Sequence, residues 1–223
     1  MRNIVKLPEP NVLTEKKEEW GSALLVAPSE NNKNKYRHSE IKGTLISETK
    51  GKCVYCESKI GHNCPGDIEH KIPKSIRADL IFEWNNMTLA CNECNRRKGE
   101  YYDTSCMFLD PNIDDVEHLI QHIGPFVFNL PGNTRAEVTL RMLELNSLTG
   151  RPNLISRKME RLESIKNLVE RIAASDNPTL KSFLLEELSE SHDISSEFSG
   201  MVMTYIEGLP SNWVSPGYKT EGS

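Results

Sequence analysis

Two pairs of cysteines constrain the fold of this chain more than any other feature of its sequence. Cys53 and Cys56 form one Cys-x2-Cys pair, and Cys91 and Cys94 form a second one. Four thiolates at this paired spacing suit a closed tetrahedral zinc site, which leaves no position open for water. The sequence therefore predicts one structural zinc ion that staples the segment between the two pairs.

Alternative assignments of the cysteines stay open at this point. A Cys-x2-Cys pair can be a redox pair, and scattered cysteines can be ordinary buried side chains. Cys64 and Cys106 have no paired partner and are expected to be ordinary small residues. His62 and Cys64 together could instead form a rival pair of metal ligands.

The composition predicts a globular protein without a membrane segment. The 223 residues are 37% hydrophobic and 26% charged, which are ordinary values for a soluble domain. No run of about 18 apolar residues occurs, so we expect no membrane-spanning helix. The first residues hold no apolar run long enough for a signal peptide. The expected location is therefore the cytoplasm, where thiols stay reduced.

The net charge of −5 is unevenly distributed along the chain. Residues 106–223 carry 10 basic and 17 acidic side chains, whereas residues 51–105 carry 8 of each. A strongly acidic surface repels phosphates, so the N-terminal half is the better face for nucleic acid. The acidic residues could equally form an ordinary solvated helical surface.

The hydrophobic pattern predicts an α+β chain with four parts. We expect an N-terminal helical segment (1–50), a cysteine-bearing core (51–105), a hairpin with a helical C-terminal region (106–207) and a flexible tail (208–223). Hairpins are expected within residues 60–72 and 116–129. Helices are expected at residues 11–27, 33–48, 92–100, 134–147, 154–174, 179–191 and 194–206.

An acidic residue and a histidine lie side by side between the two cysteine pairs. Glu69 and His70 precede Pro73, and Asn95 directly follows the second cysteine pair. A divalent cation can neutralise a phosphate oxygen, and a neutral imidazole can take a proton from water near neutral pH. One carboxylate and one amide leave several Mg²⁺ positions for water and phosphate. These residues therefore suit a metal-dependent phosphodiesterase site.

With these residues the sequence resembles the HNH endonuclease superfamily. The family pattern is an acid–His pair, an Asn before an apolar residue, and Cys-x2-Cys-Asn-x2-Lys-Gly. The resemblance implies a zinc-stapled ββα-metal fold, in which a hairpin and a helix hold one divalent ion. In this chain the pattern reads Glu69-His70, Asn86-Met87 and Cys91-x2-Cys94-Asn95-x2-Lys98-Gly99.

The resemblance also implies a role for each polar residue of the pattern. His70 would be the general base, Glu69 and Asn95 would hold the catalytic Mg²⁺, and Asn86 would position the loop and His70. Asp67, two residues before Glu69, is a second candidate ligand or a partner of the ligands. Adjacent side chains of a regular strand point to opposite faces, so Glu69 and His70 share a site only if the strand twists or ends there.

Four basic residues are expected to contact the nucleic-acid backbone. Lys98 lies three residues after Asn95, on the same face of the expected helix, where it would meet a phosphate. The other three are Arg97, Arg96 and Lys74.

The flanks of the core are similar to the HNH proteins of retron and Septu-type antiphage systems (PtuB-like). The similarity rests on residues 1–10, Met-Arg-Asn-Ile-Val-Lys-Leu-Pro-Glu-Pro, and on residues 139–146, Thr-Leu-Arg-Met-Leu-Glu-Leu-Asn. It implies a bacterial defence nuclease with an ATPase partner (PtuA-like) and, in some systems, a retron reverse transcriptase with its small DNA. Residues 176–223 match no family pattern.

The expected function is metal-dependent cleavage of nucleic-acid phosphodiester bonds in antiphage defence, with DNA as the favoured substrate. One alternative is an HNH toxin that cleaves RNA such as tRNA. Another is a zinc-dependent nucleic-acid-binding or assembly subunit that does not cleave. A nuclease assay on DNA and RNA, with Mg²⁺ or EDTA, separates the three.

Overall fold

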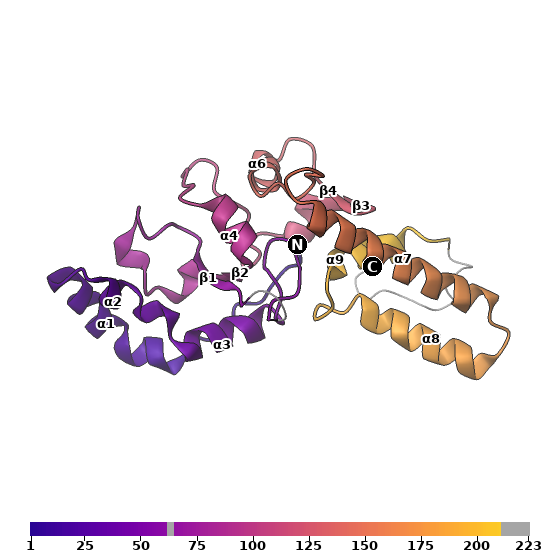
Figure 1. Ribbon diagram of the computed structural model, residues 1–223, viewed down its shortest axis with the longest axis horizontal. Helices are drawn as coiled ribbons and strands as arrows, with labels where there is room; N and C mark the ends of the chain where they lie inside the picture. The colour runs from indigo at the N-terminus through magenta and orange to yellow at the C-terminus, as the bar shows by residue number, and fades with distance from the viewer. Residues whose placement is uncertain (62–64, 211–223) are drawn as a thin grey trace. The chain divides into compact units, whose positions relative to one another are not determined.

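The computed structural model describes residues 1–61 and 65–210, and these fold as two compact units (Figure 1). The cysteine-bearing unit comprises Asn3–Val116, and the C-terminal unit comprises Glu117–Ser223 with Met1–Arg2. Helices dominate both units, and each contains one two-stranded antiparallel sheet. The predicted α+β class is confirmed. Within the described residues, no helix is both long and apolar enough to cross a bilayer.

The cysteine-bearing unit is built around one hydrophobic core. Trp20 of α1, Ile41 and Leu45 of α3, and Met87 and Leu89 of β2 all contribute to it. The N-terminal helices, expected as a segment of their own, therefore share their core with the strands of the cysteine-bearing region. The elements of this unit are α1 (Asn11–Val26), α2 (Glu30–Lys33), η1 (Lys35–Arg37), α3 (Ser39–Glu48), β1 (Asp67–His70), η2 (Ala78–Leu80), η3 (Trp84–Asn86), β2 (Met87–Ala90) and α4 (Asn92–Lys98).

The hairpin expected within residues 60–72 is wrong, because the partner of β1 lies further along the chain. β1 pairs with β2, with Glu69 opposite Thr88 and His70 opposite Met87. The long 71–86 connection between the strands is held to β1 by the side chain of Asn86, which hydrogen bonds to the backbone of residue 72. Local turn residues suggested a short hairpin, whereas the pairing is non-local.

The helix expected at 33–48 is also wrong, because the chain breaks into three shorter pieces there. The Ser29 side chain accepts a hydrogen bond from Asn32 N and caps α2. The ring of His38 then accepts from Glu40 N and starts α3 separately. Two N-terminal caps within ten residues interrupt a continuous helix. The intervening turn η1 carries Tyr36 and Arg37 towards the site described below.

Helix α4 forms as predicted, and its ends follow from two residues. The Cys91 sulfur accepts a hydrogen bond from Cys94 N at 3.4 Å and caps the first turn. Gly99, with φ of +53°, ends the helix in a conformation that favours glycine. The ββα arrangement that the resemblance implied is therefore present as β1, β2 and α4.

The C-terminal unit is a hairpin surrounded by helices. The expected hairpin around Gly124 forms, although residues 116–119 make a helical turn rather than a strand. The helix expected at 134–147 ends at Met142, and the one expected at 194–206 begins only at Ser199. Most of the expected tail, residues 211–223, lies outside the described residues. The elements are α5 (Val116–Leu119), β3 (Ile120–Ile123), β4 (Phe126–Asn129), α6 (Thr134–Met142), α7 (Pro152–Ala174), α8 (Pro178–Ser191) and α9 (Ser199–Glu207).

Candidate active site and cysteine cluster

The four paired cysteines converge at one end of the β1–β2 hairpin. The sulfur atoms of Cys53, Cys56, Cys91 and Cys94 all lie within 4.8 Å of one another, and three of the four residues are buried. The sulfurs of Cys56 and Cys91 are 3.8 Å apart. A tetrahedral zinc with bonds of about 2.3 Å would separate its sulfur ligands by about 3.8 Å. The donor set and its spacing therefore fit a closed zinc site.

The first two cysteines lie in a loop, and the other two lie at the start of α4. Burial raises the pKa of the Cys53 thiol, whereas the hydrogen bond from that thiol lowers the pKa of Cys91. His62 and Cys64, the rival ligand pair, lie outside the described residues. Cys106 is not part of the cluster.

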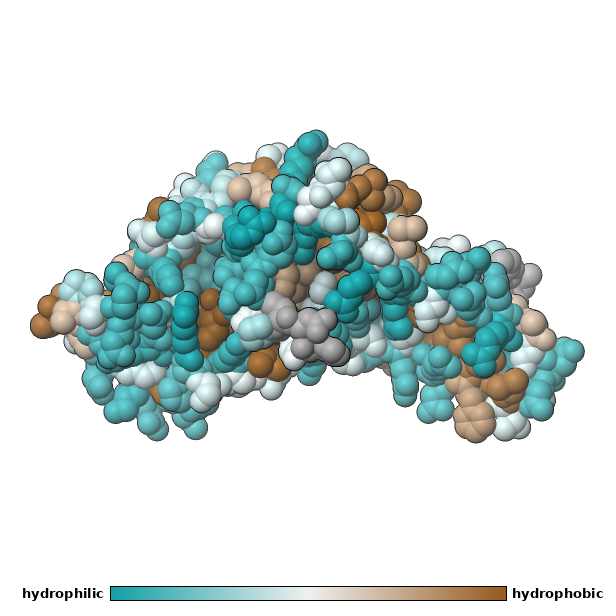
Figure 2. All heavy atoms as spheres, in the orientation of Figure 1, coloured by the Kyte–Doolittle hydropathy of each residue, from teal (hydrophilic) through white to brown (hydrophobic). Residues whose placement is uncertain are grey.

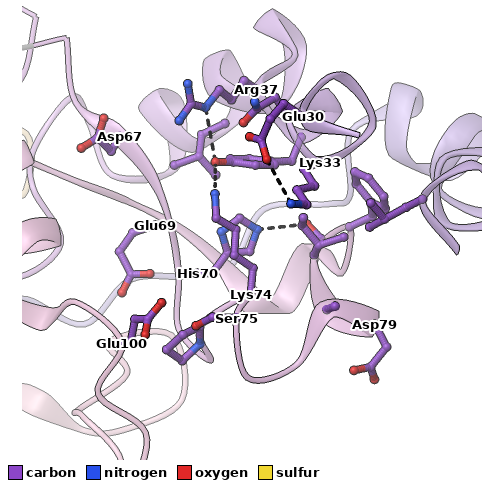
Figure 3. A pocket seen from close by; sticks show the side chains of 18 of the residues that line it. Glu30, Lys33, Arg37, Asp67, Glu69, His70, Lys74, Ser75, Asp79 and Glu100 are labelled. Atoms are coloured by element: carbon purple, nitrogen blue, oxygen red, sulfur yellow. Dashed lines mark hydrogen bonds and ion pairs between the residues drawn. The ribbon is translucent and has the colours of Figure 1, made fainter. Parts of the chain in front are cut away.

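A pocket of about 930 Å³ lies along β1, and all four residues of this strand line it (Figure 3). Six of the residues singled out from the sequence line it, together with side chains from α1, η1 and the 73–82 loop. Its wall mixes charged groups with apolar ones such as Ile81 and Phe82. The six are Asp67, Glu69, His70, Lys74, Asn95 and Lys98.

His70 is held in one tautomer at the floor of this pocket. Its Nε2 atom lies 3.0 Å from the backbone oxygen of Ile81. A carbonyl oxygen only accepts, so Nε2 carries the proton and Nδ1 keeps the lone pair. Burial lowers the pKa of His70 to about 4, so the ring is neutral at physiological pH. A neutral imidazole with one oriented lone pair is the form that a general base requires.

Glu69 lies on β1 directly before His70, which is the last residue of the strand. Both residues line the same pocket. Its Oε1 atom accepts a hydrogen bond from the Tyr55 hydroxyl at 3.0 Å and lies 2.9 Å from Lys98 Nζ. Its Oε2 atom is buried and has no hydrogen-bond partner among the described residues. Burial raises the pKa of Glu69, although the Lys98 charge opposes this shift. The carboxylate therefore has one oxygen anchored and one oxygen available for a ligand.

Lys98 lines the pocket together with Asn95, and its ammonium group is buried. The residue is 3% exposed, and Nζ donates to the backbone oxygen of His70 at 2.9 Å as well as pairing with Glu69. A substrate phosphate would have to compete with this buried carboxylate. Lys98 thus orders the two pocket residues, and its expected phosphate contact is not what the geometry favours.

The other basic residues singled out from the sequence divide into two groups. Arg96 and Arg97 form ion pairs with Glu93 on the same helix, at 2.8 Å and 2.7 Å, and neither lines the pocket. Lys74 does line the pocket, and its Nζ donates to the Tyr36 hydroxyl at 2.7 Å.

The two asparagines occupy separate positions. Asn86 is buried outside the pocket lining and ties the 71–86 connection together, with hydrogen bonds to the backbone of Ile72 and Leu80. Asn95, on α4, lines the pocket, and its Nδ2 atom donates to Asp67 Oδ2 at 3.0 Å. That hydrogen bond leaves the amide oxygen of Asn95 as an acceptor near two carboxylates.

Sequence reasoning missed three residues of this site. Tyr55 lies between Cys53 and Cys56 and was not singled out from the sequence. Tyr36 and Arg37 lay within the helix expected at 33–48, and neither was singled out. The spacing of Tyr55 from two fixed cysteines was a usable signal, whereas nothing local in the sequence indicates that η1 approaches His70.

Comparison with known proteins agrees with this geometry. Residues 53–100 match the family model described as HNH endonuclease, and this range spans both cysteine pairs and the β1–β2–α4 unit. The chain is 27% identical to the Septu protein PtuB of Bacillus thuringiensis over 145 residues, which is 62% of this chain. It is 32% identical to the Septu protein PtuB of Bacillus mycoides (strain KBAB4) over 80 residues, which is 30% of this chain.

The alignments cover only part of each relative. They include 55% of the Bacillus thuringiensis protein and 27% of the Bacillus mycoides protein. The chain thus spans about half or less of the length of these relatives.

Proposed function

We propose that residues 53–100, which match the HNH endonuclease family model in a chain similar to Septu PtuB proteins, hydrolyse phosphodiester bonds of nucleic acid. The observation that carries the proposal is His70, neutral and held in one tautomer in a pocket shared with Asp67, Glu69 and Asn95. DNA is the favoured substrate, and RNA is the alternative.

In the proposed reaction His70 accepts a proton from the attacking water at Nδ1. The Ile81 carbonyl stabilises the imidazolium that forms, because it accepts the hydrogen bond from Nε2. Transfer of one proton to a positioned base typically contributes about 10² to 10⁴ in rate.

The oxygen atoms beside His70 fit a hard divalent cation, most simply Mg²⁺. Glu69 Oε2 is buried without a hydrogen-bond partner among the described residues, and the Asn95 amide lies beside Asp67. Carboxylate and amide oxygens are the donors that Mg²⁺ prefers. Glu69 and Asn95 would hold the ion, with Asp67 as a further candidate ligand. When bound, such a cation neutralises a phosphate oxygen and the leaving oxyanion.

A nuclease assay with matched variants tests this proposal. Purified wild-type chain and His70→Ala are incubated with plasmid DNA and with total RNA, in Mg²⁺ and in EDTA. We expect wild-type cleavage in Mg²⁺ only, and a loss of about 10² to 10⁴ in rate for His70→Ala. A cooperative thermal melt and an unchanged zinc content show that the variant is folded. Wild-type rates in His70→Ala would contradict the assignment of the base.

We further propose that the chain acts in a Septu-type antiphage system, in the cytoplasm, with an ATPase partner. The similarity to Septu proteins supports this role, and the two relatives do not point to a retron reverse transcriptase. The C-terminal unit is the proposed docking surface. Residues 106–223 have an excess of acidic side chains. Leu180 and Phe183 of α8 are exposed, and the surface over α8 shows hydrophobic groups among hydrophilic ones (Figure 2).

Charge reversal separates a docking surface from a merely solvated helix. Glu186→Lys with Glu187→Lys changes an exposed adjacent pair on α8, and Glu18→Lys with Glu19→Lys makes the same change on α1. Exposed substitutions usually alter stability by about 0.5 kcal/mol or less. We expect the α8 variant alone to lose co-purification with the ATPase encoded beside it. Equal co-purification of both variants would contradict docking through α8.

A further inference from the structure

Tyr36 stands beside the candidate general base although it lies outside the matched nuclease domain. It belongs to η1, is 3% exposed, and its ring centre lies 4.7 Å from that of His70 at an interplanar angle of 82°. This edge-to-face contact is a favourable arrangement for aromatic rings. The N-terminal segment therefore forms one wall of the pocket against His70.

The Tyr36 hydroxyl holds two cationic side chains at the same place. Lys74 Nζ donates to the phenol oxygen at 2.7 Å, and Arg37 Nε donates at 3.3 Å (Figure 3). Lys74 also lies over the Tyr36 ring, 4.7 Å from its centre. Burial alone would raise the pKa of the Tyr36 phenol, but the hydrogen bonds from Lys74 and Arg37 outweigh it and lower the pKa.

These two cations differ from the other basic residues near the pocket in having no carboxylate partner. Lys33 pairs with Glu30 at 3.0 Å, Arg77 pairs with Asp79, and Lys98 pairs with Glu69. Within residues 1–61 and 65–210, neither Arg37 nor Lys74 forms an ion pair with a carboxylate. Both are exposed and both line the pocket, so their charges face solvent where an anion can approach.

We propose that Arg37 and Lys74, held in place by the Tyr36 hydroxyl, bind a backbone phosphate of the nucleic-acid substrate next to His70. This inference rests on the proposed nuclease function and identifies the phosphate contact of its site. Arg37 and Lys74 bind the substrate directly, and Tyr36 is a positioning residue. The pair replaces Lys98, whose charge is already matched by Glu69.

The chemistry of the pair fits a phosphodiester. A guanidinium group can donate two parallel hydrogen bonds to phosphate oxygens, and an ammonium adds a compact charge. The phenol oxygen takes only the Nε hydrogen of Arg37, so its terminal nitrogens stay available as donors. Phosphate contacts fix the register of a strand without reading its bases. The site should therefore bind backbone independently of sequence.

The salt dependence of binding tests the two phosphate contacts without requiring cleavage. All variants are made in a His70→Ala background, and binding of a short fluorescein-labelled DNA duplex is measured by anisotropy over a salt series. Each lost contact with duplex DNA should reduce the slope of log K against log salt by about 0.9. We expect this reduction for Arg37→Ala and for Lys74→Ala, with about tenfold weaker binding at low salt.

Lys35→Ala is the matched control. Lys35 lies on the same turn as Arg37 and carries the same charge, but it does not line the pocket. Its slope should equal that of the parent. If Arg37→Ala and Lys74→Ala also keep the parent slope, the proposed phosphate contact is wrong. A single-stranded RNA of the same length is measured in parallel and should give the same ranking.

Tyr36→Phe tests the positioning role, because it keeps the ring against His70 and removes only the phenol oxygen. In the otherwise wild-type chain we expect KM to rise several-fold while kcat stays within about twofold. An unchanged KM, with the slope of the parent, would overturn the role of the hydroxyl.

If the wild-type chain cleaves neither DNA nor RNA, the proposed function is wrong. If it cleaves but the binding slopes of the variants are unchanged, only the proposed phosphate contact is wrong.

Discussion

Replacing Asn86 with alanine should destabilise the cysteine-bearing unit by about 3 kcal/mol. The Asn86 Oδ1 atom accepts a hydrogen bond from Ile72 N at 2.8 Å, and Nδ2 donates to the backbone oxygens of Ile72 and Leu80 at 3.1 and 3.2 Å. Each bond contributes about 1 kcal/mol, and loss of the side chain leaves backbone groups unpaired. The residue is 7% exposed, so water replaces these partners poorly.

The same change should lower activity, because the loop that Asn86 fixes also fixes the general base. Leu80 directly precedes Ile81, whose backbone oxygen accepts the hydrogen bond from His70 Nε2. A loosened loop allows the imidazole to rotate or to exchange tautomers. A displacement of about 1 Å at a reacting group can reduce the rate about 10²-fold. We expect kcat of Asn86→Ala to fall by that order.

Asn85→Ala is the matched control, since Asn85 is the neighbouring asparagine and is exposed. Urea unfolding is followed by tryptophan fluorescence, because Trp20 and Trp84 lie in the core of this unit. With a slope of about 2 kcal/mol per molar urea, 3 kcal/mol lowers the midpoint by about 1.5 M. Asn85→Ala should stay within about 0.5 kcal/mol of wild type. Equal midpoints for the two variants would refute the reasoning.

Three further predictions concern the metal cluster, the buried ion pair and pH. Elemental analysis should find about one zinc per chain. The Cys91→Ser variant should lose this zinc and thermal stability, whereas Cys106→Ser should keep both. A folded wild type without zinc would contradict this. Lys98→Ala should destabilise the fold by about 3–5 kcal/mol in urea unfolding, because it leaves the Glu69 charge buried and unpaired; a loss below about 1 kcal/mol would exclude an energetically strong pair. His70 must be neutral to act as a base, so the acid limb of kcat/KM should lie near pH 4 rather than 6.5. His70 is protonated in the unfolded chain at a higher pH than in the folded chain. The stability that neutral His70 contributes is therefore complete above pH 6.5 and is lost as the pH falls towards about 4. A His70→Asn variant with the wild-type pH profile of stability would contradict that assignment.

Local chemistry in the sequence was enough to predict part of the fold. Helix α4 was predictable because Cys91 caps it and Gly99 ends it, and each of these residues lies directly beside one end of the helix. The pairing of β1 with β2 was not predictable in the same way. It depends on a 71–86 connection closed by a side chain at its far end, and a non-local closure leaves no periodic signal.

The residues of the candidate site show the same difference between local and non-local signals. Asp67, Glu69, His70 and Asn95 were found because they lie close to the cysteine pairs, and the pocket brings them together. The ion pair of Lys98 was not predicted, because helical spacing gives the face of a side chain and not its partner. Once β1 places Glu69 in a buried position, the nearest ammonium group is drawn to it.

The arrangement of the cysteine cluster explains why the candidate zinc site and the candidate active site share one small unit. Tyr55 lies inside the first cysteine pair, and its hydroxyl donates to Glu69. Asn95 directly follows Cys94 on α4, and its amide donates to Asp67. Two of the oxygen donors expected to hold the catalytic ion are thus oriented by residues adjacent to zinc ligands. A zinc ion bound by the four sulfurs would cross-link the loop and the helix and so add rigidity to these donors. The cluster therefore stabilises the fold and orients the reactive groups through the same residues.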